Sequence, residues 1–361
     1  MFMDDTVDFL EEMPANVVKK VLQNADEGTR KTINQFLNYP ENSAGSLMTI
    51  EYVDLHDYFT VRKAMDYIRR TGIDKETVYT CYVIDDQRKL VGQVSLRKLI
   101  IAPESACIRD IMDTNIVSAV TTDDQEAVAD DFRRYDLTSV AVCDKENRLV
   151  GIITIDDIVD VIQDENTEDI KKMAAIIPSD EDYMKTSVWS LVAHRLPWLM
   201  LLMISATFTS TIITHFETLL SGAVLLTAFI PMLMDSAGNS GSQTSVTVIR
   251  NLALGEIELR DWPRVLIKEI GVAVVSGAAL ALVNFLRIII FTNTSMMIAA
   301  VVSVTLFCTV IIAMIVGCLL PIGAKKLGFD PAVMASPMIT TIVDACSLMI
   351  YFLIATSMLG L

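Results

Sequence analysis

The pattern of apolar and polar positions divides the chain into two halves. Residues 1–185 alternate short apolar runs with charged turns, which is typical of a soluble fold. Residues 186–361 contain apolar runs of about 20 residues or more, the length needed to cross a bilayer. Five spans are predicted, at residues 196–216, 219–249, 265–291, 296–324 and 332–358. The pattern therefore predicts a soluble region followed by an all-α transmembrane domain of five helices.

The soluble half contains a repeat. The run LVGQVSLRKLI at residues 90–100 aligns without gaps with LVGIITIDDIV at residues 149–159. Each run follows a β-rich segment and a polar turn, and helix-like stretches precede them near residues 61–70 and 125–135. The pattern predicts a duplicated β–α–β–β–α unit. It resembles a tandem pair of CBS domains, an α/β fold whose members often bind nucleotides or ions.

The domain organisation follows from these patterns. Before the repeats, two or three short amphipathic helices are expected to pack on them, and after the repeats a long acidic helix is expected to connect the two halves. The predicted domains are a short acidic helical N domain at 1–41, CBS domains at 42–104 and 105–163, a connecting helix at 164–190, and a transmembrane domain at 191–361.

Charge separates the same two halves. Residues 1–185 carry 21 Lys and Arg against 37 Asp and Glu, whereas residues 186–361 carry 8 of each kind. An acidic soluble half argues against nucleic acid as a partner, because phosphate binding needs a basic face. No signal segment opens the chain, and basic residues follow the second and fourth spans. We therefore expect a multi-pass protein of the cell membrane with its N-terminus in the cytoplasm and its C-terminus outside.

The cysteines and histidines give no metal cage. Six cysteines are scattered singly without a CxxC pair, and the three histidines are isolated. Zinc cages and disulfide frameworks need such residues at short, regular spacings, so neither is expected.

A stripe of carboxylates marks the end of the repeats. Asp157, Asp160, Asp164 and Glu168 fall within about 80° of one another on a helix. Like charges at this spacing destabilise a helix by a few tenths of a kcal/mol per pair, so bound divalent ions are the favoured explanation for the stripe. For Asp157 alone, a capping box with Thr154 on a solvated face is an equally good interpretation.

Asp344 lies in the last apolar run, where residues 332–361 hold no Lys or Arg. Burying a charge at the centre of a membrane helix costs roughly 2.5–3.5 kcal/mol even on lenient scales, so such a residue usually faces water or a cation. In the second span, Asp235 and Asn239 stand one turn apart among Gly and Ser. Helix packing explains the small residues but not this polar pair. If residues 330–344 were helical throughout, Asp330 would lie about 21 Å from Asp344 along the axis, at the cytoplasmic mouth.

Three motifs carry a family resemblance: GNSGSQ at residues 238–243, DPA at 330–332 and IVDA at 342–345. With the acidic N domain, the CBS pair and five spans, the chain resembles the MgtE family of magnesium channels and transporters. The resemblance implies that cytosolic regions sense intracellular Mg²⁺ and close the pore. The implied pore residues around a hydrated Mg²⁺ are Asp344, Asn239 and Thr340, with Asp235 as a candidate second carboxylate.

The resemblance also implies regulatory Mg²⁺ ligands, which fasten the cytosolic part and the connecting helix over the pore. These are Asp136, Asp157, Asp160, Glu165, Glu168 and Asp330, with weaker matches at Glu126, Asp4 and Asp8. The chain departs from the family in its short N domain, in Ala237 before the motif glycine, in Asp235 where relatives commonly have Gly, and in Ser336 where they commonly have Asn. Because a lone five-span chain encloses a path with difficulty, a homodimer with two Asp344 carboxylates across one pore is expected.

Alternatives stay open at this point. The same fold could carry Co²⁺, Ni²⁺ or Zn²⁺, although these softer metals favour His or Cys and the path offers only Cys346. An intramembrane aspartyl protease could use Asp235 and Asp344, but neither has the GxGD setting of such enzymes, so no enzyme is expected. A CBS receptor that transports nothing would leave Asp344 unexplained. ATP remains open as a ligand of the CBS pair, near Thr154 and Asp157.

Overall fold

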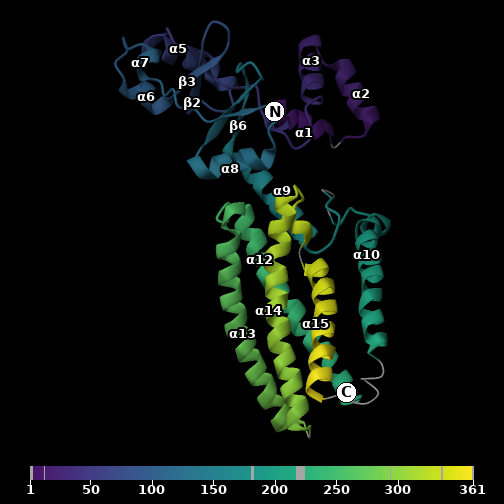
Figure 1. Ribbon diagram of the computed structural model, residues 1–361. Coiled ribbons are helices and arrows are strands. Elements are labelled where there is room, and N and C mark those ends of the chain that lie inside the picture. The colour runs from purple at the N-terminus through teal and green to yellow at the C-terminus, as the bar shows by residue number, and fades with distance from the viewer. Residues whose placement is uncertain are drawn as a thin grey trace. The chain divides into compact units, whose positions relative to one another are not determined.

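The computed structural model describes residues 3–11, 13–179, 183–216, 224–292, 294–334 and 336–359. The chain forms two compact units, Met1–Glu165 and Asn166–Leu361. The first contains three N-terminal helices and two small sheets, and the second is helical (Figure 1).

The N-terminal segment forms three helices: α1 (Met3–Glu11), α2 (Ala15–Asn24) and α3 (Glu27–Phe36). The Asp26 side chain caps α3 by accepting a hydrogen bond from the Thr29 amide at 3.0 Å. Val7 and Phe36 are each 2% exposed and join the core of the second repeat, which includes Phe132. The predicted amphipathic helices and their packing on the repeats are confirmed.

Each repeat forms a three-stranded sheet with the same topology. The strands are β1 (Asp54–His56), β2 (Thr80–Ile84), β3 (Leu90–Ser95), β4 (Ser118–Val120), β5 (Ser139–Cys143) and β6 (Leu149–Thr154). In both sheets the first strand pairs parallel to the second, and the second pairs antiparallel to the third. Both hairpins contain a bulge, before the pairs Ile84–Leu90 and Cys143–Leu149. The alignment of the two repeats in sequence therefore holds down to the register in the two hairpins, where Thr80 pairs with Ser95 and Ser139 pairs with Thr154.

Helices precede, connect and follow the strands in the two repeats. Their bounds are α4 (Ala44–Leu47), α5 (Val61–Thr71), η1 (Gly72–Asp74), α6 (Leu96–Ile101), α7 (Ile108–Ile111) and α8 (Gln125–Tyr135). A shared core of both sheets includes Tyr52, Tyr82, Ala141 and Leu149. Within it, the hydroxyls of Tyr82 and Ser139 form a hydrogen bond of 2.9 Å between β2 and β5. The predicted β–α–β–β–α duplication is confirmed.

The helix after the second repeat differs from the expected connecting helix at residues 164–190. It is α9 (Ile155–Met173), which begins directly after β6 and ends earlier than expected. It ends because Ala175 takes the left-handed conformation (φ 55°). The amides of Ile176 and Ala175 then donate to the carbonyls of Lys171 and Lys172, both at 2.9 Å, which is the Schellman pattern.

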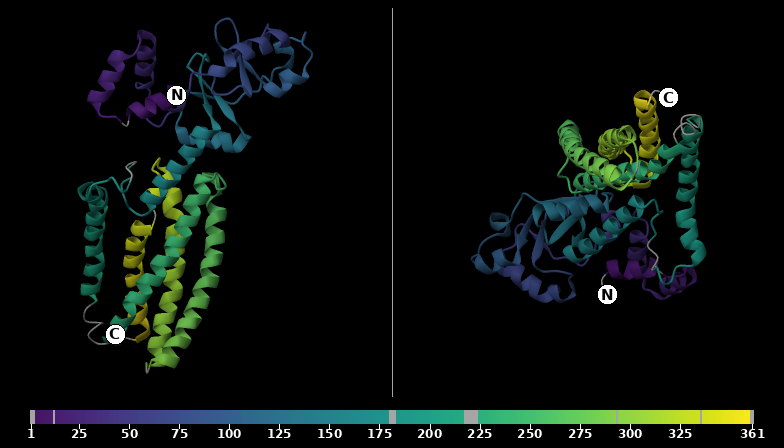
Figure 2. Two further views of the ribbon diagram at one scale, coloured as in Figure 1. Left: turned by 180° about the vertical axis from the view of Figure 1, so that it is seen from behind. Right: turned by 90° about the horizontal axis from the view of Figure 1, so that it is seen from below.

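The second unit is built around one central helix. Its elements are α10 (Val188–His215), η2 (Val224–Phe229), α12 (Ile230–Ala253), η3 (Leu259–Asp261), α13 (Trp262–Phe291), α14 (Met296–Lys326), η4 (Pro331–Met334) and α15 (Ser336–Leu359). Helix α14 packs against α12, α13 and α15, and α10 packs against α15 (Figures 1 and 2). Glycines allow the closest approach, because a Cβ on Gly317 would collide with the Gly241 carbonyl oxygen. Helices α12 and α14 therefore cross backbone to backbone.

Four helices of the described residues are long and apolar enough to cross a membrane: Val188–His215, Leu259–Phe291, Met296–Lys326 and Pro331–Leu359. Five spans were expected. Helix α12, the core of the expected second span, has the length, 24 residues, but polar residues lower its hydropathy. Residues 330–344 are not helical throughout, so the distance of about 21 Å that assumed a continuous helix does not apply. Residues 331–334 form the separate turn η4, and α15 begins only at Ser336, because the prolines at 331 and 337 interrupt the hydrogen-bond ladder.

Candidate metal-ion site

Helix α12 has a buried face and a polar face. On the buried side, Ala237, Gly241 and Ser245 are in the core of the second unit. Exposed polar residues recur every four positions on the other side: Asp235, Asn239, Gln243 and Thr247. Four-residue spacing places them along one stripe of the helix. A polar stripe of this length is unfavourable against lipid tails, so it must face water or another protein surface.

The stripe lies next to Asp344 of α15. A Cβ on Gly238 would lie 3.2 Å from Cγ2 of Thr340, so α12 and α15 are in close contact one turn before Asp344. Asp344 is half-buried and lies close enough to Asp235 for the charge of Asp235 to act on it. The four predicted pore residues, Asp344, Thr340, Asp235 and Asn239, are therefore brought together on two neighbouring helices.

A further carboxylate of the second unit lies next to the GNSGSQ motif of α12. The Thr244 hydroxyl donates a hydrogen bond of 3.1 Å to Oε2 of Glu269, on α13. Glu269 was not among the predicted site residues. It follows Lys268 in the sequence, and no motif marks it; only the contact with α12 reveals it.

Asp157 lies in an acidic cluster of the first unit. The Thr154 hydroxyl is 2.8 Å from Oδ2 of Asp157 and also contacts Asp156. Burial raises the pKa of Asp157, and hydrogen bonds from Thr154 oppose this effect. Burial, and next the charges of Asp156 and Asp157, raise the pKa of Glu76, whose Oε2 is buried without a hydrogen-bond partner among the described residues. The cluster is short of positive charge.

The capping-box interpretation of Thr154 and Asp157 is supported as well. Hydrogen bonds from the Thr154 side chain and backbone reach the Asp157 carboxylate at the start of α9. Glu76 was missed in the sequence because it belongs to the first repeat, whereas Asp157 belongs to the second. Only the fold brings the two together.

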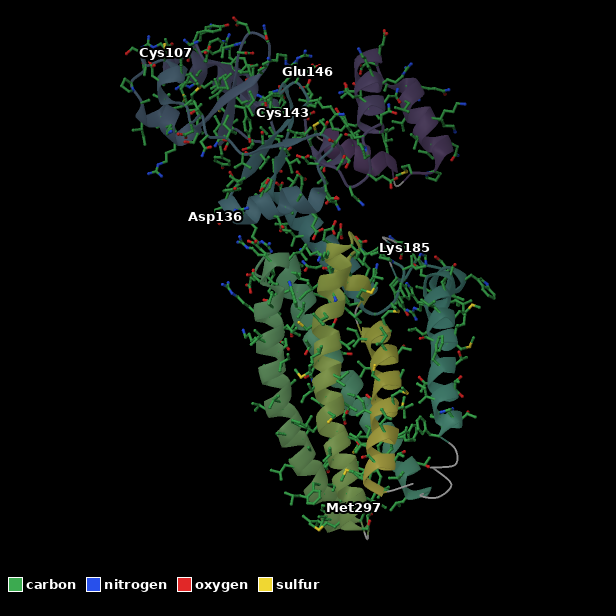
Figure 3. All side chains as sticks on the ribbon, viewed as in Figure 1. Cys107, Asp136, Cys143, Glu146, Lys185 and Met297 are labelled. Atoms are coloured by element: carbon green, nitrogen blue, oxygen red, sulfur yellow. The ribbon has the colours of Figure 1, made fainter. Side chains whose placement is uncertain are left out.

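The other predicted regulatory residues of the first unit lie at several positions on α8 and α9. Asp136 ends α8 in the left-handed conformation (φ 51°) and is exposed (Figure 3). Glu126 lies exposed in the first turn of α8, and Asp160 is exposed on α9. Glu165 accepts a hydrogen bond of 2.8 Å from Gln125. The side chains of Asp4 and Asp8 lie outside the described part of the structure.

Glu168 and Asp330 share a partner in the second unit. The Lys172 ammonium lies 2.6 Å from Oε1 of Glu168 and 2.7 Å from Oδ2 of Asp330. Burial alone would lower the pKa of Lys172, but the hydrogen bonds that its ammonium donates to Asp330 and Glu168 outweigh this effect and hold that pKa above its ordinary value. The predicted metal ligands are thus brought together, and a lysine lies between them.

The donor set decides how a regulatory Mg²⁺ would fit. In the described ranges, no three His, Cys, Asp or Glu side chains are grouped so as to hold a bare metal ion. Mg²⁺ usually keeps several waters and is bound by one or two carboxylates, so Asp157 with its acidic neighbours fits a hydrated ion. Glu168 and Asp330 do not fit one as they stand, because Lys172 lies between them.

Comparison with known proteins places the chain. The family model described as a divalent cation transporter, MgtE, matches residues 230–354, CBS-domain models match 44–105 and 108–164, and a model of the MgtE intracellular N domain matches 1–42. The magnesium transporter MgtE of Thermus thermophilus is 36% identical over 361 residues, covering 99% of this chain and 80% of the relative. This chain belongs to the MgtE family of magnesium transporters. The Bacillus subtilis MgtE is 35% identical, over 98% of this chain and 78% of that protein.

Two solved structures of magnesium-transport proteins match part of this chain. The crystal structure of the soluble part of a magnesium transporter is 38% identical, with a TM-score of 0.45, and the match covers 46% of this chain and 64% of that one. The cytosolic domain of the Mg²⁺ channel MgtE in complex with ATP is 39% identical, with a TM-score of 0.43, over 45% of this chain and 66% of that one.

Membership of the MgtE family decides between the alternatives for the two membrane aspartates. The relatives are named as transporters, not enzymes, so Asp235 and Asp344 are not a protease dyad. The matched residues 230–354 contain α12, α13 and α14 and most of α15, and therefore all four predicted pore residues. The residues that match the transporter family model therefore include the polar stripe.

Proposed function

We propose that this chain conducts Mg²⁺ along the polar stripe of α12, with Asp344 as the carboxylate that holds the passing ion. The observation that carries this proposal is the polar stripe of α12. Its exposed residues Asp235, Asn239 and Gln243 lie on the helix that packs beside Asp344. Mg²⁺ sheds its waters reluctantly. A polar path with few charges can therefore bind the hydrated ion through its waters and still release it.

The functional unit is a homodimer in the cell membrane. One copy leaves the stripe of α12 exposed, and two copies around an axis would enclose it and place two Asp344 carboxylates across one path. The expected orientation, with the N-terminus in the cytoplasm and the C-terminus outside, puts the acidic first unit on the side where it meets intracellular Mg²⁺.

Intracellular Mg²⁺ closes the path. Asp157 and its acidic neighbours repel one another without a cation, and bound Mg²⁺ relieves that repulsion. The other proposed regulatory ligands are Asp136, Asp160, Glu165, Glu168, Asp330 and Glu126, of which Glu168 and Asp330 are paired with Lys172. Because Mg²⁺ binds the closed state better, it shifts the population toward that state.

Flux through proteoliposomes tests the pore. In Asp344→Asn the carboxylate is replaced by a neutral amide of the same size, and Mg²⁺ uptake should fall at least tenfold. Glu256→Gln, an exposed carboxylate of the same unit, should leave uptake unchanged. Asp235→Asn reports whether the second carboxylate shares the path. Wild-type uptake in Asp344→Asn would refute the pore assignment.

Protease protection tests the sensing. Millimolar Mg²⁺ should slow proteolysis of the full-length wild type, and the double variant Asp157→Ala/Asp160→Ala should need at least tenfold more Mg²⁺ for the same protection. Equal protection of both proteins would contradict the assignment of Asp157 and Asp160.

Other divalent ions are the second candidate, since the matching family model is described as a divalent cation transporter and Cys346, a free thiol, lies two residues after Asp344. Competition of Co²⁺, Ni²⁺ and Zn²⁺ with Mg²⁺ uptake distinguishes them, because a path for softer metals would lose Co²⁺ and Zn²⁺ competition in Cys346→Ser.

ATP binding by the CBS pair is a separate proposal. Radiolabelled ATP should bind the wild type, and its affinity should be lower for Thr154→Val.

A further inference from the structure

The contact between Lys172, Glu168 and Asp330 has the geometry of a cation site that a side chain fills. Both carboxylates lie within 2.7 Å of the ammonium. The Lys172 side chain is 24% exposed, and those of Glu168 and Asp330 are 36% and 35% exposed, so water screens the contact only in part. The lysine occupies the space in which a metal ion bridging the two carboxylates would have to lie.

The three side chains are held in place by their own segments. Glu168 stands four residues before Lys172 on α9, the order in which an ion pair best stabilises a helix. Asp330 is oriented from the other side, because its Oδ1 accepts a hydrogen bond of 2.8 Å from the Ala332 amide at the start of η4. The ammonium therefore connects two segments that are each fixed independently.

Contacts around the lysine connect the same segments. Met173, next in sequence, packs against Ile249 of α12 and Ala332 of η4, which are 4% and 1% exposed. About two turns earlier on α9, Asn166 accepts a hydrogen bond of 3.0 Å from the Arg250 guanidinium of α12. The last turns of α9 are thus attached to α12 and η4 by a small apolar core, a hydrogen bond and the lysine contact.

We propose that Lys172 is an intramolecular competitor of Mg²⁺ for Glu168 and Asp330. The inference deepens the proposed sensing function and rests on it. A divalent ion and an ammonium cannot occupy the same gap, because their charges repel and the two carboxylates cannot neutralise both. Mg²⁺ must displace Lys172 to bind there. The lysine thereby holds α9 to η4 when Mg²⁺ is scarce and raises the Mg²⁺ concentration at which the site fills.

Removing the competitor has two effects of opposite sign. In Lys172→Met, which keeps the length and apolar stem of the side chain, the attachment of α9 to η4 weakens without metal. With metal, the free carboxylate pair binds Mg²⁺ at lower concentration. Loss of a merely structural salt bridge would produce the first effect and not the second.

The experiment uses full-length protein in detergent and two readouts. One is the rate of chymotrypsin cleavage at Tyr183, which is 67% exposed and lies between α9 and α10. The other is direct Mg²⁺ binding by calorimetry. In chelator, Lys172→Met should be cleaved at least threefold faster than wild type, and on titration its binding and protection midpoints should fall at least fivefold.

Two further variants control the result. Lys171→Met removes the neighbouring lysine, whose ammonium contacts the Ser179 carbonyl rather than a carboxylate, and should leave the Mg²⁺ midpoint unchanged. Asp330→Asn in the Lys172→Met background should abolish the gain in affinity. If Lys172→Met keeps the wild-type midpoint while wild type responds to Mg²⁺, the competition is refuted and sensing stands. If wild type shows no Mg²⁺ response at all, the proposed sensing function itself is refuted.

Discussion

The two repeats of the first unit share a backbone and differ in the charge and length of their last helix. Helices α6 and α9 begin at matched positions of the repeat, Leu96 and Ile155. Arg97 and Lys98 of α6 correspond to Asp156 and Asp157 of α9. Helix α6 has 6 residues and ends before a proline, whereas α9 has 19. One fold position thus holds a short basic helix in the first repeat and a long acidic one in the second.

The difference marks the repeat in which the proposed sensing function places a cation. In the first repeat, Lys98 supplies the positive charge itself, at 2.6 Å from Asp113. In the second repeat, the matched Asp157 lies beside Asp156 and Glu76. Its carboxylate accepts a hydrogen bond from the uncharged Thr154 hydroxyl. Duplication therefore explains the backbone of α9, and the proposed metal response explains its charge.

The largest effect is expected from a variant that interrupts α9 with a proline at the position where a proline follows α6. Ile162→Pro places a proline at the position that matches Pro103, inside the 19-residue helix. Proline removes a helix hydrogen bond and clashes with the preceding turn, at a cost of about 3 kcal/mol. Thermal unfolding of the full chain should occur at lower temperature, and intracellular-side Mg²⁺ should no longer inhibit flux.

Ile162→Ala is the matched control, because Ile162 is 39% exposed and alanine preserves the helix. It should keep the Mg²⁺ inhibition. A proline variant that is still inhibited at the wild-type Mg²⁺ concentration would show that a continuous α9 is not required for the response.

A reciprocal charge exchange comes next. Asp157→Lys gives the second repeat the residue of the first, and the new ammonium should pair with Asp156 and Glu76 in place of a metal. The Mg²⁺ concentration for half-protection from proteolysis should rise at least tenfold, which corresponds to about 1.4 kcal/mol. Lys98→Asp, the reverse exchange, should leave it unchanged, because only an exposed ion pair worth about 0–1 kcal/mol is lost. Equal shifts in both variants would contradict the comparison.

The sequence predicts the parts of this picture that depend on neighbouring residues. The repeats, the amphipathic helices and the long apolar runs follow from local periodicity. The acidic stripe is confirmed as part of one helix, since Asp157, Asp160 and Glu168 all lie on α9. The end of α9 was placed too late, because a left-handed Ala175 has no signature as strong as glycine.

The unpredicted parts are contacts between distant segments. Most of the sequence of the helical unit separates Lys172 from Asp330, and Thr244 and Glu269 belong to different helices. A sequence pattern indicates which face of a helix is polar, not what that face meets. For this reason, the same interpretation that predicted Glu168 and Asp330 as metal ligands missed the lysine between them.

Loss of the hydrogen bond between the two repeats should have a smaller effect on thermal stability. Tyr82→Phe removes the hydroxyl that contacts Ser139 in the shared core. A buried hydrogen bond contributes about 1 kcal/mol, and somewhat more when its partner is left unsatisfied. The full chain should unfold a few degrees lower, with unchanged Mg²⁺ flux. Tyr79→Phe, at a tyrosine that is 75% exposed, should unfold like wild type. Equal melting of both variants would show that the bond adds no net stability.

The acidic cluster predicts a pH dependence. Burial raises the pKa of Asp157, so the folded state favours its neutral form. Its stabilising contribution is present at pH below the ordinary carboxyl range and is lost as pH rises through the raised pKa. In chelator, Asp157→Asn should therefore melt above wild type at pH 7, and the gap should close toward pH 4. A gap that widens on acidification would contradict this direction.

The smallest effect is expected at the end of α9, where the two repeats terminate differently. Helix α6 stops in extended backbone at Ala102, before a proline, whereas α9 stops through the left-handed Ala175. The left-handed conformation costs a residue with a Cβ atom about 1–2 kcal/mol, and glycine avoids this cost. Glycine also has a more flexible unfolded chain, which lowers stability by about 0.5–1 kcal/mol. Ala175→Gly should therefore stabilise the chain by about 0.5 kcal/mol in thermal unfolding. Ala174→Gly, one residue earlier, should destabilise it instead, and the same sign in both variants would show that the Schellman turn does not set the end of α9.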